Sequence, residues 1–308
     1  MAPSAPVSTC KKAWVITGPT SGIGYQTALE LAKHGTVVLV GRSKRKLDAV
    51  EGEIRSHGGQ AVSVIADLSD VTSARRAARE IAALDLLIAG MVNNAGIMPV
   101  KPFTTAQGWD GTFATDHLGP FALTEALIPA LPDGANVVFI CSAVEDPERR
   151  LAHMVGFRGA RYISAEASAR GEWLGGGSKM AGADAYATSK QGNLATVLGF
   201  SRGFPRLRFN AVEPGVTPGS NLSRDAPAGA RAVEKVMSVF APFMKSFSTP
   251  KRSARVITKV LTESGTTGIY YDEKGKPMRG SKQVNDPAFQ DRYITETRAL
   301  LATLPAEA

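Results

Sequence analysis

Cysteine and long apolar runs are scarce in this sequence, and each scarcity excludes a class of protein. Two cysteines among 308 residues, Cys10 and Cys141, are too few for a disulfide framework and form no CxxC pair of the kind that binds zinc. No run approaches about 18 consecutive apolar residues, so we predict no membrane-spanning helix. We expect free thiols in a reducing cytoplasm and no metal site.

Acidic residues are outnumbered by basic ones, which gives a formal net charge of +8. Such a balance fits nucleic acid, a membrane surface or an anionic small ligand as a partner. Apart from a cluster at residues 42–46, the basic residues are scattered and do not alternate with aromatic ones. We therefore expect a small-molecule ligand and no nucleic-acid partner.

Short β-branched apolar runs alternate with amphipathic stretches of helical length. Continuous apolar runs are typical of strands buried on both faces of a parallel sheet. The predicted strands are 13–17, 36–40, 61–66, 84–89, 136–142, 207–212 and 268–271. The predicted helices are 22–34, 44–56, 71–82, 105–130, 184–202, 251–262 and 287–301. This order predicts an α/β fold, with a Rossmann-like doubly wound parallel sheet of about seven strands flanked by helices.

Residues 13–308 are expected to form a single domain, because no linker or internal repeat divides them. Residues 1–12 are rich in Ala, Pro and Ser and lack the pattern of a signal peptide, so we predict a disordered lead-in. Two stretches, 144–183 and 217–250, show no clear strand and are interpreted as substrate-loop insertions over one end of the sheet.

A glycine-rich turn joins the first predicted strand to the first predicted helix. Glycines allow a tight turn and a close approach of the main chain to a pyrophosphate, and the helix N-terminus adds free N–H groups. The cofactor contacts expected here are Gly18, Thr20, Ser21, Gly22, Ile23 and Gly24. The spacing G-x-x-x-G-x-G resembles the classical branch of the short-chain dehydrogenase/reductase family, and motifs further along extend this resemblance over residues 13–271.

Arg42 and Ser43 follow the second predicted strand. A Rossmann domain that binds NAD carries an acidic residue near this point to hold the ribose 2′-hydroxyl. Arg42 is instead suited to pair with a 2′-phosphate, with Ser43 and Thr20 as hydrogen-bond donors. Basic residues at a helix start oppose the helix dipole, which also favours a bound anion. We therefore predict NADP(H) as the cofactor in preference to NAD(H).

Three further motifs follow predicted strands in the order found in this family. Asp67 and Leu68 resemble its adenine-contacting pair, and Asp67 is also placed to cap the next helix. An Asn-Asn-Ala-Gly motif and a Pro-Gly motif follow the fourth and sixth strands; the latter implies contacts with the nicotinamide carboxamide. Their expected cofactor contacts are Asn94, Ala95, Gly96, Pro214, Gly215, Val216 and Thr217.

Tyr186 and Lys190 match the family's Tyr-x-x-x-Lys motif. Residues four apart share one face of a helix, so the phenol and the ammonium point into the same cleft. We expect Lys190 and an oxidised nicotinamide to lower the pKa of Tyr186 and make it usable as a general acid or base. The resemblance implies that Lys190 and Tyr186 also contact the cofactor, and that Ser142, at the end of the fifth strand, polarises a substrate carbonyl.

The sequence departs from the family pattern at Asp116, where the family often has an asparagine that supports a proton relay. An ionised Asp116 accepts hydrogen bonds but cannot donate them, and its charge opposes ionisation of Tyr186. Ser142 and Tyr186 are also 44 positions apart, a lengthening similar to that in retinol-dehydrogenase-like and protochlorophyllide-reductase-like members. We expect this insertion to line the substrate site, with Trp173 and Tyr162 as contacts, and His117 to be structural.

The sequence thus favours an NADP(H)-dependent oxidoreductase that moves hydride between nicotinamide and a carbonyl or secondary alcohol. By analogy, the substrate is a small lipophilic or polycyclic molecule. Two alternatives stay open: a cofactor-binding regulator or scaffold that lost turnover, and a dehydratase or isomerase on the same fold. A homo-oligomer stays open as well: many relatives pair through their long helices, which here would use exposed faces of 105–130 and 184–202, but retinol-dehydrogenase-like members need not pair.

Overall fold

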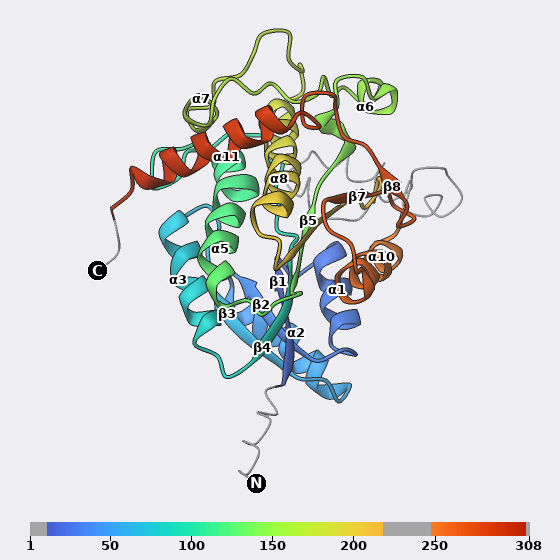
Figure 1. Cartoon of the computed structure of the whole chain (residues 1–308). Helices are drawn as coiled ribbons and strands as arrows, with labels where there is room; N and C mark the ends of the chain where they lie inside the picture. The colour runs from blue at the N-terminus through green and yellow to red at the C-terminus, as the bar shows by residue number, and fades with distance from the viewer. Residues whose placement is uncertain (1–10, 218–247, 306–308) are drawn as a thin grey trace.

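The residues that the structure describes, 11–217 and 248–305 of this computed structural model, form three layers around one sheet (Figure 1). Its eight strands lie in the order β3-β2-β1-β4-β5-β6-β7-β8, and all neighbours are parallel except β7 and β8. The strands are β1 (Lys12–Thr17), β2 (Thr36–Gly41), β3 (Ala61–Ile65), β4 (Leu87–Asn93), β5 (Asn136–Ile140), β6 (Arg208–Val212), β7 (Ile269–Tyr271) and β8 (Pro277–Met278). The predicted doubly wound sheet is confirmed, with one antiparallel edge strand more than expected.

Helices cover both faces of the sheet, as the apolar strands require. The α-helices are α1 (Gly22–Leu31), α2 (Lys44–Ser56), α3 (Val71–Ala82), α4 (Gly111–Phe113), α5 (Gly119–Leu127), α6 (Arg150–Met154), α7 (Ala165–Ala169), α8 (Ala183–Gly203), α10 (Pro250–Glu263) and α11 (Pro287–Ala302). A π-helical turn η1 (Ala114–Leu118) and the 3₁₀ turns η2 (Ile128–Ala130) and η3 (Ala143–Glu145) join them. One core lies under α1, α2 and α10, and the other under α3, α5, α8 and α11.

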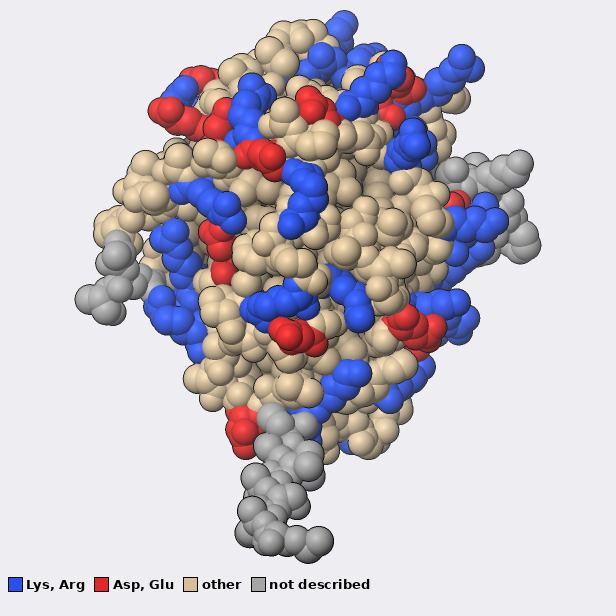
Figure 2. Space-filling view, viewed as in Figure 1, with Lys and Arg blue, Asp and Glu red and all other residues tan. Residues whose placement is uncertain are grey.

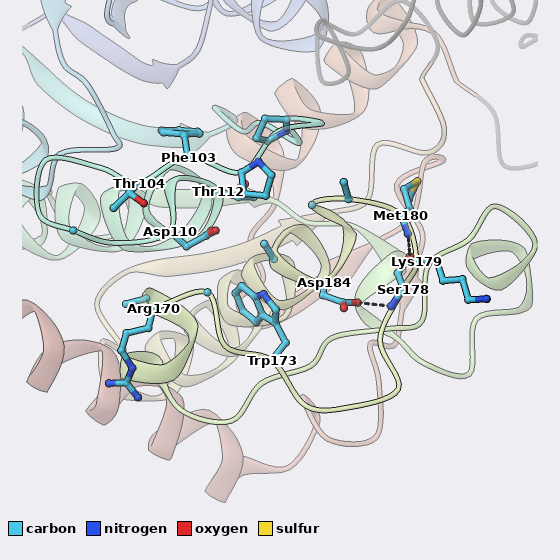
Figure 3. A pocket seen from close by; sticks show the side chains of 18 residues that line it. Phe103, Thr104, Asp110, Thr112, Arg170, Trp173, Ser178, Lys179, Met180 and Asp184 are labelled. Carbon is cyan, nitrogen blue, oxygen red and sulfur yellow. Dashed lines mark hydrogen bonds between the residues drawn. The ribbon is translucent and has the colours of Figure 1, made fainter.

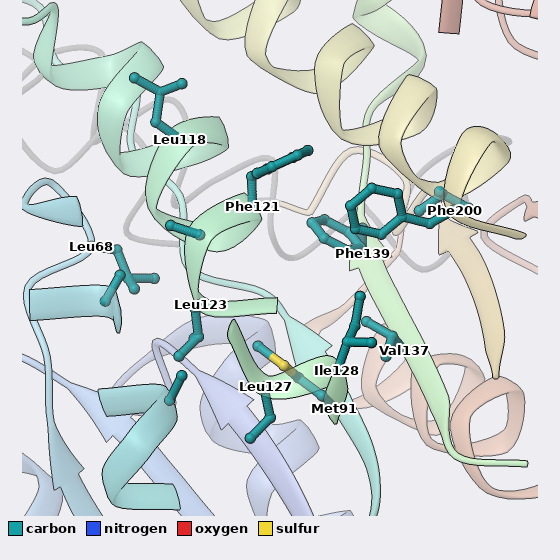
Figure 4. Close-up of a cluster of buried hydrophobic side chains, with 14 of the residues drawn as sticks. Leu68, Met91, Leu118, Phe121, Leu123, Leu127, Ile128, Val137, Phe139 and Phe200 are labelled. Carbon is teal, nitrogen blue, oxygen red and sulfur yellow. The ribbon is translucent and has the colours of Figure 1, made fainter. Parts of the chain in front are cut away.

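Aromatic packing in the larger core fixes α8 against the sheet. Figure 4 shows Phe121 of α5, Phe139 of β5 and Phe200 of α8 converging, and all three are buried. The ring centroids of Phe121 and Phe200 are 5.4 Å apart. Burial of one such side chain stabilises a fold by about 1.5–3 kcal/mol, so these contacts hold α8 at one position over β5.

Two predicted elements begin several residues later in the structure than expected. β4 begins at Leu87 rather than residue 84, because Leu84 and Leu86 belong to a turn in which Leu86 N–H donates to the Leu84 carbonyl. The long helix predicted over 105–130 begins at Gly111, because Gly108 has a φ of +80° and Thr104 pairs with Asp110 across a turn. The helix is also interrupted by the π-helical turn η1. Apolar spacing alone does not reveal any of these breaks.

Of the two stretches interpreted as insertions, the structure describes the first in full and the second only at its ends. Residues 143–183 carry η3, α6 and α7 and no strand, as expected. Residues 218–247, which make up most of the second stretch, and 1–10 of the expected lead-in lie outside the described residues. Within the described part of the chain, no helix is long and apolar enough to cross a membrane.

The surface bears on two expectations from the sequence, the kind of partner that a basic chain binds and pairing through exposed helix faces. On the face in Figure 2, Lys and Arg side chains are spread among Asp, Glu and neutral residues. α8 has no exposed residue between Ala183 and Ser201, and α11 packs against it (Figure 1). The expectation that α8 offers an exposed face for pairing is therefore wrong, because the C-terminal helix covers that face.

A close approach of main chains brings α5 against the loop after β3. A Cβ added to Gly119 would lie 2.0 Å from the carbonyl oxygen of Leu68, whereas one added to the exposed Gly52 of α2 would meet nothing within 4 Å. We expect Gly119→Ala to lower the free energy of unfolding by about 1–3 kcal/mol through overpacking. Gly52→Ala should raise it by about 1 kcal/mol through helix propensity. Urea unfolding of both variants checks this, and equal effects would contradict the close approach.

Candidate active site

The sequence-predicted site residues gather at one edge of the sheet, where the carboxyl ends of its parallel strands meet. Gly18 follows β1, Asn94 follows β4, Ser142 follows β5, and Pro214 follows β6. Tyr186 and Lys190 project from the first turns of α8. The structure thus brings together side chains that are up to about 200 positions apart in the chain.

The glycine-rich turn is closed by hydrogen bonds from Asn94. Its Nδ2 donates to the carbonyl oxygens of Thr17, at 2.9 Å, and Gly18, at 3.3 Å. Gly18 has a φ of +66°, and a Cβ on Gly24 would lie 2.2 Å from the Gly18 oxygen, so both positions require glycine. Ser21 precedes α1 without a side-chain cap. The main-chain N–H groups at this helix start are therefore available, which fits a pyrophosphate.

Arg42 lies beside Asp67 at the end of β2. Their side chains are half exposed, and Arg42 Nη1 is 3.7 Å from Asp67 Oδ2. Ser43 precedes α2 and makes no capping hydrogen bond, so its hydroxyl is available to a ligand. Asp67 Oδ1 accepts from the main chain and hydroxyl of Ser69. The expectation that Asp67 caps α3 is wrong, because Asp70 does so by accepting from Thr72 N–H.

Ser142, Tyr186 and Lys190 form the centre of the cleft. Lys190 Nζ lies 5.2 Å from the centroid of the Tyr186 ring and donates to the Ile140 carbonyl at 3.2 Å. Tyr186 is 8% exposed, and its phenol is hydrogen-bonded with Ser142. A phenol, a hydroxyl and an ammonium thus converge where β5 ends.

The pKa of Tyr186 lies above its ordinary value, contrary to the expectation that Lys190 lowers it. Burial is the largest cause, followed by the charges of Asp116 and Glu213, while the hydrogen bond with Ser142 acts in the opposite direction. The sequence indicated that Asp116 opposes ionisation of Tyr186, but not that burial and Glu213 do so as well. The protein chain therefore favours the neutral phenol, which is a proton donor.

Asp116 is fully buried in the π-helical turn η1 and faces Lys190. Its Oδ1 accepts from Ile97 N–H at 2.8 Å. Its Oδ2 is 3.8 Å from Lys190 Nζ and has no hydrogen-bond partner among the described residues. Burial raises the pKa of Asp116 to about 7, although Lys190 and the Ile97 N–H lower it. The Asp116 main-chain carbonyl accepts from Asn193 Nδ2 at 2.8 Å, which anchors η1 to α8.

His117 is structural in its contacts, as expected. Its Nδ1 is 3.1 Å from Asn193 Oδ1, and its Nε2 is 3.1 Å from Thr297 Oγ1. Burial lowers the pKa of His117 to about 4, so the ring is neutral near neutral pH. The contact with Thr297 ties the centre of the site to α11.

Sequence reasoning missed two carboxylates that hold the loop around Ser142. A Glu213 carboxylate oxygen accepts from Ala143 N–H and, at 3.3 Å, from the Tyr270 hydroxyl. Buried Glu145 accepts from the main chain and hydroxyl of Ser281, both at 2.7 Å. Glu145 N–H in turn donates to the Ser142 carbonyl at 3.2 Å. The available signal was the acidic Glu213 directly after the apolar strand β6.

The Pro-Gly segment after β6 is held by its neighbours. The Pro214 carbonyl accepts from Ser253 Oγ at 2.9 Å, and Gly215 has a φ of +74°. Thr217 Oγ1 donates to the Gly215 carbonyl at 3.1 Å, while Val216 is exposed. The Val216 carbonyl accepts from Ser248 N–H at 3.0 Å.

A pocket of about 480 Å³ lies beside this centre, between residues 99–112 and 169–185 (Figure 3). Trp173 lines it, as expected of the insertion. Tyr162 does not, because its ring stacks on Tyr293 at 3.9 Å in the core and its hydroxyl donates to Glu296. The expectation that Tyr162 contacts the substrate is therefore wrong. No cluster of three or more potential metal ligands occurs in the described ranges.

The fold and this edge define a class of protein, an α/β nucleotide-binding protein with a Tyr–Lys cleft. Comparisons agree: residues 12–154 match the family model described as short chain dehydrogenase. Retinol dehydrogenase 13 of Mus musculus is 31% identical over 94% of this chain and 84% of its own length. A crystal structure of an uncharacterized protein from Mycobacterium Paratuberculosis is 26% identical, has a TM-score of 0.71 and matches over 96% and 95% of the two chains.

A second solved structure, a short chain dehydrogenase from Burkholderia cenocepacia J2315 in complex with NADP, is 22% identical. Its TM-score is 0.63, over 86% of this chain and 96% of that one. The chain belongs to the short-chain dehydrogenase/reductase family, and within it resembles the retinol dehydrogenase type. Membership makes it an oxidoreductase that uses a nicotinamide cofactor, and the turn around Gly18 fits one.

The burial of Glu145 gives a pH-dependent contribution to stability. Burial raises the pKa of Glu145 from 4.5 to about 7, despite the two hydrogen bonds from Ser281. The folded state thus holds this proton more tightly than the unfolded state, so the contribution is complete below about pH 4.5 and is lost as pH rises through about 7.

We expect Glu145→Gln, which keeps an acceptor for Ser281 N–H and needs no proton, to gain melting temperature relative to the parent as pH rises from 5 to 8. Thermal unfolding at both pH values measures this difference. A difference that does not change with pH would contradict a buried, protonated Glu145.

Proposed function

We propose that the chain is an NADP(H)-dependent oxidoreductase acting on a carbonyl or secondary alcohol of a small, lipophilic or polycyclic substrate. The observation that carries this proposal is the convergence of Ser142, Tyr186 and Lys190 beside the glycine-rich turn. A bound nicotinamide supplies or accepts the hydride. The protein's own groups then have to bind the substrate oxygen and move one proton.

Ser142 and Tyr186 have the chemistry for this task. The Ser142 hydroxyl donates a hydrogen bond to the substrate oxygen, where negative charge develops during reduction. The neutral Tyr186 phenol protonates that oxygen. Because burial, Asp116 and Glu213 all raise the pKa of Tyr186, the cleft favours the proton-donating form, which supports carbonyl reduction over alcohol oxidation.

Lys190 and Asp116 have supporting roles in this proposal. Lys190 orients the nicotinamide ribose and is itself held by the Ile140 carbonyl. Asp116 faces Lys190 across 3.8 Å, and its pKa of about 7 lets it exchange a proton with its surroundings near neutral pH. Asp116 thus replaces the amide of the family pattern with a group that can itself carry a proton.

The first experiment follows NADPH absorbance while the full chain meets a panel of aldehydes, ketones and quinones. For a substrate that turns over, we expect Tyr186→Phe to lower kcat by about 100-fold or more, since it removes the general acid. Tyr271→Phe is the matched control, because its hydroxyl contacts Ser264 and Thr266 instead of the cleft. Full activity in Tyr186→Phe would refute the mechanism, and product formed without NADPH consumption would favour the dehydratase or isomerase alternative.

The preference for NADP(H) is supported by Arg42 and by the absence of an acidic residue at that position of the chain. Thr20 and the uncapped Ser43 add hydroxyl donors for a 2′-phosphate. Solved relatives of the same fold are described as complexes with NADPH and NADP. The remaining contacts proposed for the cofactor are the glycine-turn, Asp67–Leu68, Asn94–Gly96 and Pro214–Thr217 segments.

Removal of the Arg42 guanidinium should weaken the NADP(H) preference. We expect Arg42→Ala to raise KM for NADPH by about tenfold, as for loss of a charge-assisted pair, and to leave KM for NADH nearly unchanged. Arg45→Ala, an exposed residue three positions further on in the first turn of α2, is the control and should change neither value. Equal effects of Arg42→Ala on both cofactors would contradict a role at the 2′-phosphate.

A cytoplasmic location and the absence of a nucleic-acid partner belong to the same proposal. The low cysteine content supports the former. The interspersed charges of the surface in Figure 2 support the latter.

A further inference from the structure

The pocket between residues 99–112 and 169–185 lies next to the proposed catalytic centre but does not contain it. Ser142, Tyr186 and Lys190 are absent from its lining. Two of its residues connect it to that centre: Ala185 directly precedes Tyr186 in α8, and Met180 packs against the buried cluster that includes Tyr186. A volume of about 480 Å³ is within the range of small-molecule sites. A substrate held at Tyr186 thus has room for a second group here.

The acidic and the basic side chains around this pocket point in different directions. In Figure 3, Asp110 points toward the space between the two segments, whereas the side chains of Arg170 and Lys179 extend away from it. Arg170 is also engaged outside the pocket, because its guanidinium forms ion pairs with Glu166, at 2.7 Å, and Glu172, at 2.9 Å. The charge that the pocket presents to a ligand is therefore negative, although the whole chain carries +8.

Two carboxylates line the pocket, and each uses one oxygen in the protein. Asp110 Oδ1 accepts from Phe113 N–H at 2.8 Å, and Asp184 Oδ1 accepts from Ser178 N–H at 2.9 Å. Among the described residues neither carboxylate forms an ion pair, and both accept from main-chain N–H groups. Burial raises the pKa of Asp110 above its usual range, and a cation beside it would lower that pKa by stabilising the carboxylate.

Aromatic and apolar groups form the rest of the wall. Trp173 packs edge-on against Phe113, with ring centroids 6.3 Å apart, and lines the pocket. Phe103 lies on the segment opposite Trp173 and is 41% exposed. Its ring covers Gly111 of the same segment, where any Cβ would collide with it. An indole face beside carboxylates is a favourable environment for an organic ammonium group, through the ring quadrupole and the opposite charge.

We propose that this pocket is a substrate subsite that takes a protonated amine attached to an apolar or aromatic body, with Asp110, Asp184 and Trp173 as its specificity-determining residues. The inference rests on the proposed function and gives it a substrate class, an amine-bearing carbonyl compound. The body lies against Phe103 and Met180, and its carbonyl extends past Ala185 toward Tyr186. Anionic groups are disfavoured here because the carboxylates of Asp110 and Asp184, which line the pocket, repel them.

Binding is tested on the full chain by titration calorimetry at pH 7, without turnover. The probes are 1-naphthylmethylamine, which is protonated at this pH, its neutral analogue 1-naphthylmethanol, and 1-naphthoate. We expect the amine to bind tighter than the alcohol, and the alcohol tighter than the carboxylate. Raising NaCl from 0.05 to 0.5 M should weaken the amine alone, because salt screens a partly exposed ion pair.

Variants locate the binding in this pocket. Asp110→Asn and Asp184→Asn keep the oxygen that accepts from Phe113 N–H or Ser178 N–H, and each should weaken the amine up to about fivefold, the size of a partly exposed ion pair. Neither should change binding of the alcohol. Trp173→Ala should weaken both, and Lys179→Ala, whose side chain extends away from the pocket, should weaken neither.

The proposal is overturned if the amine binds no tighter than the alcohol, or if its preference survives in Asp110→Asn and Asp184→Asn alike. If a variant does not fold, the salt dependence of amine binding to the parent protein still tests the proposal. Failure of the proposed function is distinguishable. If the amine binds in a way that depends on Asp110 but NADPH reduces no ketone, the proposed function fails and the subsite stands. If neutral and amine-bearing naphthyl ketones are reduced with equal KM, the subsite alone is rejected.

Discussion

A buried ammonium group organises the catalytic edge of this protein. Lys190 of α8 is 3% exposed. Its Nζ has partners on two other elements, the Ile140 carbonyl at the end of β5 and the Asp116 carboxylate in η1, so three elements meet at this group. Leaving such a charge buried without partners costs several kcal/mol, so the three elements must come together for the chain to fold well. The Tyr186 ring, 5.2 Å from Nζ, is placed by the same convergence.

Carboxylates give this cleft its electrostatic character. Asp116 and Glu213 both raise the pKa of Tyr186, and Glu213 also holds Ala143 N–H beside Ser142. Glu213 therefore both holds the loop beside Ser142 and helps to keep the phenol neutral. Asp116 adds a second negative charge, which an amide at its position would not supply.

The region between β5 and α8 acts as a wall rather than a strand-forming unit. It contributes α6, α7 and Trp173, and it closes one side of the pocket next to Tyr186. The C-terminal helix α11 supports this wall from behind, through the Tyr162–Tyr293 stack and the Glu296 carboxylate. Because α11 also covers α8, one terminal helix stabilises the insertion and occupies the face on which a second subunit was expected.

The amino-acid sequence by itself determined the parallel sheet, the bounds of α2 and α3, the glycine-rich turn and the Tyr186–Lys190 pair, since these depend on local spacing. Continuous apolar runs and residues four apart are properties of neighbouring positions. Only the tertiary structure decided the late starts of β4 and α4, the raised pKa of Tyr186, the core position of Tyr162 and the anchoring of Ser142 by Glu213 and Glu145. The physical reason is that burial and charge pairing depend on groups from distant parts of the chain: Glu145 meets Ser281 across 136 positions, and no local pattern encodes that contact.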